Sequence, residues 1–488
     1  MKGKLPAKAA CSKPRDVLTL LPYELSVQCL RYLPLHSLLA VASTCRAWRR
    51  LVFNAELWYA QCRAHGYLGL IQTRYAKSDI RPCGLLVPLA STRDAELLST
   101  KEPPRSPPTL AVHAETLVQG LGDHYTLTPT TQAYVDWANE FRYHYALETQ
   151  WHKGRYTVRD LSGHKDVVLA VRVDPTRGFV YSGSRDGTAK VWNLHTHRCI
   201  KTLQGHSMAV SCLDVDASEG TMATGSWDGT VRVWALQESA EDASPSRLAT
   251  QFVCAYILDQ GDEVICLRLK GQELAAGTSL GLVQLWDTTT GDCKKVFNFA
   301  AEAADRGLDI GGDNTIVSCV DMDETFVYAG IGRSVAVLDR QRDRVLTHIT
   351  MHSSPVTAIK LDARTFVSGA EDSSVLAWHR PRYPLSQLGS ARATVPHCSH
   401  HSPTKPPESF LDHIEPHMLH GHFSGVRCLQ TFGNRLCTGS YDTSIRVWSI
   451  ERGQEKCLVK LKGHAGDVNA VDMTHDLVVS GSDDGLIK

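Results

Sequence analysis

The stretch SGSRDGTAKVW, residues 182–192, decides the fold because the chain repeats it. Related stretches are TGSWDGTVRVW at 224–234, SGAEDSSVLAW at 368–378 and TGSYDTSIRVW at 438–448. Each begins with Ser or Thr, carries an Asp in a turn and ends on a Trp six residues after that Asp. Such recurrence indicates one supersecondary unit copied along the chain.

A histidine precedes each copy. Gly-His pairs end at His164, His206, His422 and His464, and a Met-His pair ends at His352. The distances from His164 to His206 and from His422 to His464 are both 42 residues. A period of about 40 to 45 residues, with Gly-His near the start and Trp near the end, is typical of four-stranded propeller blades. Short β-branched runs between Asp, Gly and Pro turns agree with this interpretation.

Two further units are degenerate. Residues 262–287 keep Trp286 but have Leu280 at the Asp position, and residues 316–339 have Leu338 at the Trp position. Their strand pattern predicts blades, which gives seven in total. The stretch YTVRDL at 156–161 precedes the first Gly-His pair, and we expect it to form the outer strand of blade seven.

Residues 156–488 resemble the WD-repeat family, because the motif recurs. The resemblance implies an all-β seven-bladed propeller in which His, Ser or Thr, Asp and Trp form a buried hydrogen-bond network. The implied structural residues are His164, Ser182, Asp186 and Trp192; His206, Thr224, Asp228 and Trp234; His352, Ser368, Asp372 and Trp378; His422, Thr438, Asp442 and Trp448; and His464, Ser480 and Asp484.

A Ser-His-Asp set also suggests nucleophilic catalysis. One chain needs one active site, whereas this set recurs five times at nearly fixed spacing, so a structural role is favoured. We therefore predict no catalytic residue and no cofactor. The sequence PHCSHHSP, with His397, Cys398, His400 and His401, hints at a metal site but lies in a Pro- and Ser-rich insertion. Without a second ligand pair at finger spacing, a solvated loop is favoured and no metal is predicted.

The N-terminal segment 17–62 is rich in apolar residues at helical intervals, interrupted by Pro34. Three short helices are predicted, and an ordinary helical bundle is one interpretation. The segment also closely resembles the F-box motif through Leu21-Pro22, Glu24-Leu25, Leu33, Leu38-Leu39, Cys45, Trp48 and Leu57-Trp58. The resemblance implies binding to a Skp-type adaptor, and through it to a cullin, by Leu21, Pro22, Leu25 and Leu38.

The predicted organisation is multidomain, with an all-α F-box and helical linker before the propeller. Residues 1–16 are expected to be a disordered tail, 17–62 the F-box and 63–155 a linker that is helical from about 131. Trp137, Phe141, Tyr145 and Trp151 recur at helical intervals, which favours that helix. The pattern resembles the connector with a W-x-x-G ending in F-box/WD-repeat proteins.

Charge and cysteine usage exclude some partners. Lys plus Arg and Asp plus Glu both number 52, so no global field favours nucleic acid or a membrane surface. The fifteen cysteines form no C-x-x-C pair, which indicates reduced thiols. The N-terminus lacks the apolar run of a signal peptide. We expect a cytoplasmic or nuclear protein, or both.

The combined resemblance is to F-box/WD-repeat substrate receptors of SCF-type ubiquitin ligases. It implies a non-catalytic subunit that binds target proteins on the propeller and directs their ubiquitination. The alternative is a WD-repeat scaffold that uses its F-box to bind an adaptor without ubiquitin transfer. An enzyme in its own right is the least favoured interpretation. The identity of the target, its phosphorylation and the oligomeric state stay open.

In such proteins, recognition side chains stand five residues after the motif His and one residue before the motif Asp. On this resemblance the substrate-binding candidates are Arg185, Ser211, Trp227, Arg427 and Tyr441. Two guanidiniums can hold one phosphate or carboxylate. A mixed solvated rim is the alternative for each residue.

The last stretch, SGSDDGLIK at 480–488, stops before its Trp position. From the spacing of the other copies we expect that Trp at about 490. The sequence therefore predicts an incomplete seventh blade and a natural chain that continues by at least a few residues.

Overall fold

The structure is a computed structural model. It describes Leu30, Leu38, residues 55–65, 67–68, 71, 78–80, 86–88, 136–238, 250–299, 316–340, 344–350, 352–362, 365–379, 416–451, 453 and 455–488. The chain divides into two compact units, Met1–Thr149 and Gln150–Lys488. Leu21, Pro22, Leu25 and the His397–His401 cluster lie outside the described residues.

The first unit contains helix α4 (Ala55–Ala64), the two-stranded sheet β1 (Ser78–Ile80) and β2 (Leu86–Pro88), and most of α6 (Trp137–Lys153). The sheet is a correction to the all-α N-terminal part that the sequence predicted. Aromatic packing joins α4 to α6, because the rings of Trp58 and Phe141 lie 5.3 Å apart. Asp136 caps α6 by accepting hydrogen bonds from the backbone N–H groups of Ala138 and Asn139.

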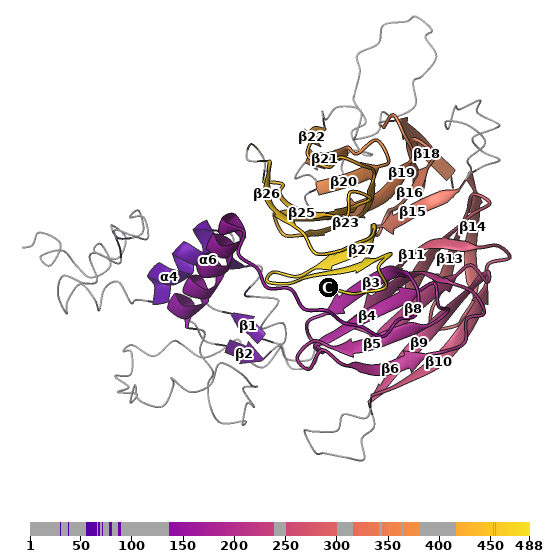
Figure 1. Ribbon diagram of the computed structural model, residues 1–488, viewed down its shortest axis with the longest axis horizontal. Helices are drawn as coiled ribbons and strands as arrows, with labels where there is room; N and C mark the ends of the chain where they lie inside the picture. Colours follow the sequence, from indigo (N-terminus) through magenta and orange to yellow (C-terminus); the bar gives the residue numbers. More distant parts are fainter. Residues whose placement is uncertain are drawn as a thin grey trace, which may run out of the picture. The chain divides into compact units, whose positions relative to one another are not determined.

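After the end of α6, the described residues of the second unit form β-strands, among them six four-stranded antiparallel sheets (Figure 1). The strands of blades one to three are β3 (Val168–Asp174), β4 (Phe179–Ser184), β5 (Ala189–Asn193), β6 (Cys199–Leu203); β7 (Val210–Asp216), β8 (Thr221–Ser226), β9 (Thr230–Glu238), β10 (Thr250–Asp259); β11 (Val264–Lys270), β12 (Glu273–Thr278), β13 (Leu282–Asp287), β14 (Cys293–Asn298).

The strands of blades four to six are β15 (Val317–Met322), β16 (Phe326–Ile331), β17 (Ser334–Asp339), β18 (Arg344–Thr350); β19 (Val356–Leu361), β20 (Thr365–Ala370), β21 (Val375–His379), β22 (His417–Leu419); β23 (Val426–Phe432), β24 (Arg435–Ser440), β25 (Ile445–Ser449), β26 (Lys456–Leu461). A seventh sheet has only two strands, β27 (Val468–Met473) and β28 (Val478–Ser482).

The first strands of all the sheets form a closed ring. Contacts run from β3 to β7, β11, β15, β19, β23, β27 and back to β3. The prediction of seven blades needs correction, since the structure has six four-stranded blades and a two-stranded sheet in the seventh place. Apolar residues of neighbouring sheets fill the space between them, as where Val168, Val171 and Trp192 pack against Val479.

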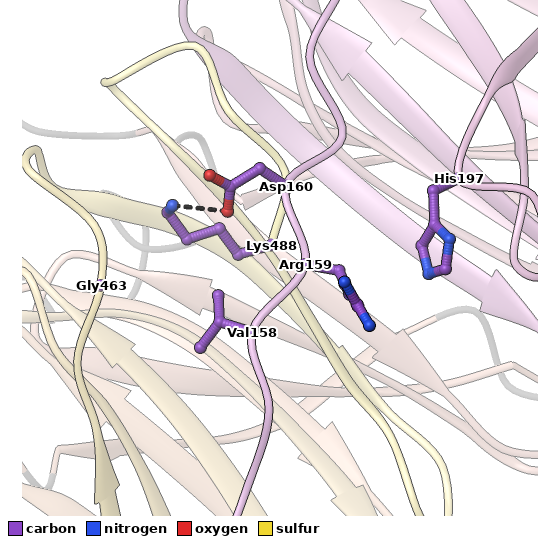
Figure 2. A pocket seen from close by; sticks show the side chains of 6 residues that line it. All are labelled: Val158, Arg159, Asp160, His197, Gly463 and Lys488. Carbon is purple, nitrogen blue, oxygen red and sulfur yellow. Dashed lines mark hydrogen bonds and ion pairs between the residues drawn. The ribbon is translucent and has the colours of Figure 1, made fainter.

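The expected outer strand at 156–161 is also not formed. Only Leu161 pairs, through a β-bridge to Ile487, with hydrogen bonds of 2.8 and 3.2 Å in the two directions. The preceding residues line a cavity of about 560 Å³ together with His197, Gly463 and Lys488. Figure 2 shows Lys488 reaching Asp160 there, with Nζ 2.8 Å from Oδ1. One bridge and one ion pair therefore stand where a full strand ladder was expected.

The recurrent motif forms a hydrogen-bond network at one end of each regular blade. In blade six, His422 Nδ1 lies 3.0 Å from Asp442 Oδ2, and His422 Nε2 lies 2.8 Å from Thr438 Oγ1. Trp448 Nε1 donates to the same hydroxyl at 2.9 Å. Blades one and two repeat all three bonds, through His164, Ser182, Asp186 and Trp192 and through His206, Thr224, Asp228 and Trp234. The network ties the loop before the first strand to the turn between the second and third strands.

The degenerate third blade replaces this network with different residues. Trp286 Nε1 donates to Gln260 Oε1 at 3.1 Å. Gln260 stands at the position of the motif His and accepts the indole N–H that the Ser or Thr hydroxyl accepts in the regular blades. Asp262 accepts hydrogen bonds from the Ser279 hydroxyl and the Leu280 N–H, at 2.7 and 2.8 Å. A carboxylate from the loop before the strand therefore substitutes for the missing motif Asp.

Replacing Thr438 with Val should destabilise the full chain strongly. The buried hydroxyl serves both His422 and Trp448, and a methyl group leaves two buried polar groups without partners. We expect the free energy of unfolding in urea to fall by about 2 to 4 kcal/mol. The matched control is Thr196→Val at an exposed turn, which should change it by less than about 0.5 kcal/mol. Equal effects of the two substitutions would argue against the network.

Acidification should destabilise the propeller in two stages. Burial lowers the pKa of His164, His206, His352 and His422 below 6.5, although the neighbouring Asp opposes this. The unfolded chain then binds more protons, so stability should fall as the pH drops below about 6.5.

The second stage involves the motif carboxylates. Burial alone would raise the pKa of Asp186, Asp228 and Asp442, but hydrogen bonds outweigh it and hold the pKa at about 2. Stability should therefore fall further between about pH 5 and pH 2, with each group contributing at most about 1.4 kcal/mol per pH unit. Urea denaturation at a series of pH values checks this, and stability that stays constant from pH 7 to pH 4 would contradict it. His195→Gln, on an exposed turn, is the control that should leave the profile unchanged.

Candidate functional site

The predicted recognition positions lie together at the end of the propeller that carries the motif histidines, here called the His end. The residue before each motif Asp donates its N–H to the carbonyl three residues after the motif His. Arg185 N bonds Val167 O at 2.9 Å, and Tyr441 N bonds Gly425 O at 3.0 Å. Trp227 makes the equivalent bond to Ala209 O at 3.1 Å. Both kinds of position are therefore brought to the same end of the sheets.

A β-bulge marks the other recognition position. In all seven first strands the register shifts across the residue that stands five after the motif His or its equivalent. The skipped residues are Leu169, Ser211, Ile265, Ser318, Thr357, Arg427 and Asn469. A bulge leaves one residue unpaired and redirects its side chain. The sequence showed the spacing of this position but not the bulge that makes it special.

Ser211 is engaged in holding two blades together. Its hydroxyl donates to Val264 O of the next blade at 2.5 Å, with Gly225 O at 3.2 Å. Ser318 makes the same bond to Val356 O at 2.5 Å, and Thr357 makes it to Val426 O. The bulge position thus joins neighbouring first strands wherever it carries a hydroxyl. Target binding by Ser211 stays a prediction, and its hydroxyl already has a structural partner.

A charged arc crosses the His end from blade five to blade one. It consists of Glu371, Arg427, Tyr441, Asp467, Asp483 and Arg185. Arg427 Nη1 lies 3.3 Å from the Tyr441 hydroxyl, and its guanidinium lies 6.0 Å from the centre of that ring. Burial and the nearby Asp483 raise the pKa of Asp467, while Arg427 opposes them. The structure therefore brings Arg427 and Tyr441 together, with the Asp467 carboxyl group near the guanidinium.

Arg185 differs from Arg427 in its surroundings. It is exposed, and within the described part of the chain its side chain makes no hydrogen bond or ion pair. Between the two arginines, blade seven contributes Asp483, whose carboxylate accepts a hydrogen bond from Asn469 at 2.7 Å. Asn469 also donates to Val168 O at 3.2 Å, which fixes its amide. Two guanidiniums with a carboxylate between them form a patterned rim and not a purely cationic one.

An apolar arc lies at the same end on blades two to four. Trp227 is half-buried, and the exposed fractions are 49% for Met208, 63% for Leu280 and 38% for Ile316. Sequence reasoning singled out Trp227 alone. The signal for Leu280 was present, because it stands at the Asp position of a blade whose carboxylate function has moved to Asp262. The His end therefore divides into an apolar arc and a charged arc.

The predicted adaptor-binding residues are described only in part. Leu38 has a helical backbone conformation, and its side chain has no exposed surface. Full burial favours a role in the interior of the first unit, and its contact with an adaptor stays a prediction. Leu21, Pro22 and Leu25 cannot be placed, since they lie outside the described residues.

Three further observations concern the described residues only. No three or more His, Cys, Asp or Glu side chains among them are arranged to hold a metal ion. All ten described cysteines are free thiols. Neither described helix has the length and apolar character needed to cross a membrane.

Comparison with known families matches both parts of the chain. Residues 18–64 match the F-box-like family model. Four segments match the family described as WD domain, G-beta repeat, and they cover residues 155–193, 197–235, 415–449 and 455–488.

Several known proteins are similar to the chain at modest identity. An F-box protein of Saccharomyces cerevisiae is 25% identical over 186 residues, which are 38% of this chain and 24% of that protein. The probable E3 ubiquitin ligase complex SCF subunit scon-2 of Neurospora crassa is 26% identical over 207 residues, 38% of this chain and 32% of that protein. A DENN domain and WD repeat-containing protein of Arabidopsis thaliana is 27% identical over 165 residues, 31% and 14% of the two chains.

The chain thus spans about a third of the length of these relatives or less. The two family matches fall on separate segments of one polypeptide, with the F-box-like segment before the repeats. The chain therefore combines an F-box-like segment with WD-domain repeats.

Proposed function

We propose that the chain is the substrate-recognition subunit of an SCF-type ubiquitin ligase. The observation that carries this proposal is an F-box-like segment joined to WD repeats, together with relatives that are named as subunits of such complexes. In this role the F-box-like segment binds a Skp-type adaptor and, through it, a cullin. The propeller holds the target, and other subunits carry out ubiquitin transfer. A cytoplasmic or nuclear location would follow from this role.

The His end of the propeller is the proposed target site. Its variable side chains stand on a frame that the motif networks hold rigid, and rigid positioning lowers the entropic cost of binding. The apolar arc offers Met208, Trp227 and Leu280 for desolvated contacts, which usually dominate peptide affinity. The charged arc can orient the bound peptide, because charged side chains at the rim of an interface select among partners.

The proposed target is a short peptide segment with an anionic group beside an apolar or aromatic residue. Arg185 is exposed and unpaired among the described residues, so it can bind a phosphate or carboxylate without losing an existing partner. Arg427 would have to exchange part of its contact with Tyr441. The carboxylates of Asp467 and Asp483 would disfavour a second anion nearby, so one negative group is preferred over several.

Replacing Leu21 and Pro22 with Ala should weaken adaptor binding. A few apolar residues dominate such interfaces, so we expect a loss of about 2 kcal/mol or more, which is about thirtyfold in Kd. The measurement is titration of the purified chain with a Skp-type adaptor. Arg63→Ala, an exposed residue of α4, is the control and should leave the Kd unchanged. Unchanged binding by the double variant would place the adaptor site elsewhere.

Co-purification with adaptor and cullin, followed by ubiquitin transfer to a captured target, tests the function itself. Adaptor binding without any transfer would support the scaffold interpretation instead.

The arginines of the charged arc should be needed for target binding. The ligand is a target protein identified by its ubiquitination in the presence of the chain. We expect the Arg185→Ala and Arg427→Ala double variant to bind this target at least about tenfold more weakly, a loss of about 1.4 kcal/mol or more in binding free energy. Adaptor binding should not change. The control is Lys270→Ala, which removes an exposed charge at the far end of β11. If target affinity is the same in the double variant and the control, recognition lies outside the His end.

A further inference from the structure

A second opening lies at the opposite end of the first strands. A cavity of about 360 Å³ is lined by residues at the ends of these strands and the turns that follow them. Its lining includes Arg172, Asp214, Arg268, Lys360 and Asp472. Along β3, Arg172 stands three residues beyond the bulge residue Leu169, or about 10 Å at the rise of a strand. This cavity is therefore separate from the proposed target site.

A ring of polar side chains surrounds this opening, with one member from each first strand. The ring comprises Arg172 of β3, Asp214 of β7, Arg268 of β11, Asp321 of β15, Lys360 of β19, Gln430 of β23 and Asp472 of β27. Charges alternate around most of it. Three cations and three carboxylates give a formal net charge of zero.

The carboxylates of the ring are buried, and each accepts hydrogen bonds. Asp214 accepts bonds from Arg172 Nε at 2.8 Å, Arg268 Nη1 at 3.2 Å and Leu269 N at 2.9 Å. Asp321 lies 2.9 Å from Arg268 Nε and accepts from Leu361 N at 2.8 Å. Asp472 accepts from Gln430 Nε2 at 2.6 Å and from Val173 N at 2.8 Å. Their negative charge is therefore already compensated within the wall.

The cations that line the cavity keep unused donors. The arginine side chains are 25% and 24% exposed, whereas those of Asp214 and Asp321 are only 3% and 2% exposed. Arg172 donates hydrogen bonds from Nε and Nη1, and Arg268 donates one from Nη1 and forms an ion pair through Nε. The Nη2 group of each makes no hydrogen bond within the described part of the chain. The exposed surface of the ring thus comes mainly from its arginines, although the carboxylates of Asp174 and Asp362 also line the cavity.

Lys360 is the member of the ring without a partner. It is 8% exposed and lines the cavity, and among the described residues it makes no hydrogen bond or ion pair. Burial and, next, the nearby Arg268 lower the pKa of Lys360 to about 8, while Asp321 opposes them. The amine is therefore mostly protonated at neutral pH, and it lies at the cavity without a hydrogen-bond or ion-pair partner among the described residues, which favours a counter-ion there.

We propose that this cavity binds an oxyanion, a phosphate or carboxylate group of a small molecule, between Lys360 Nζ and the free edges of Arg172 and Arg268. Three donors from three strands would match the oxygens of such a group, and charge-assisted bonds of this type are strong. The cavity volume lies near the lower end of the range for small-molecule sites. This site is independent of target binding at the His end.

Binding of inorganic phosphate and of succinate to the full chain tests the proposal, with chloride at matched ionic strength as the reference. Calorimetric titration at pH 7 should show saturable binding of at least one of the two anions. Binding of phosphate alone would identify a phosphorylated ligand, and binding of succinate alone would identify an organic acid. Lys360→Met should weaken binding of that anion at least about tenfold in Kd, whereas Lys201→Met on the exposed strand β6 should leave the Kd unchanged. No saturable binding of either anion would overturn the proposal.

A second measurement uses the unmodified chain and so does not depend on folding of a variant. Acylation of lysines by a water-soluble active ester at pH 8, followed by peptide mass spectrometry, should modify Lys360. The anion that binds should slow this modification at least about fivefold and leave Lys201 unaffected. An equal modification rate of Lys360 with and without the anion would contradict its place in the site.

Discussion

The imidazole of the motif histidine is the link on which the propeller depends. One ring nitrogen holds the carboxylate of the turn between strands two and three, and the other holds the hydroxyl that receives the indole N–H. Each of these groups would be costly to bury alone, and together they satisfy one another. Because the ring joins a loop to a turn, it also fixes the distance between the two variable positions beside it. Recognition residues can then vary without loss of the frame.

This division explains which features the sequence predicts. The network residues are few and recur at nearly fixed spacing, and each one bonds to the others. Blades one, two, five and six were therefore recognisable from the amino-acid sequence. Blade three was only partly recognisable, because Gln260 replaces the His at its position and Asp262 supplies the carboxylate from a different position. A pattern search finds identical residues at identical spacing, whereas hydrogen bonding requires only donors and acceptors in the same space.

The candidate site was predictable in position more than in role. Arg185, Trp227, Arg427 and Tyr441 do stand at the His end, because the motif spacing sets their place. The hydrogen bond from the Ser211 hydroxyl to Val264 O could not be predicted from the spacing of the motif residues, since it depends on the neighbouring blade. The same holds for the missing ladder at 156–161. Contacts between distant segments decide these features, and local patterns carry no information on them.

The polar ring at the other opening follows from a different constraint. A carboxylate near the end of one first strand can accept the N–H of the next first strand, which no apolar side chain can do. Asp214, Asp321 and Asp472 make this bond to Leu269, Leu361 and Val173. Buried carboxylates then require cations beside them, which Arg172 and Arg268 supply. Lys360 takes no part in these hydrogen bonds, although its charge helps to lower the pKa of the Asp214 carboxyl group. An unpaired cation at the mouth of a cavity is explained more simply by a ligand than by the fold.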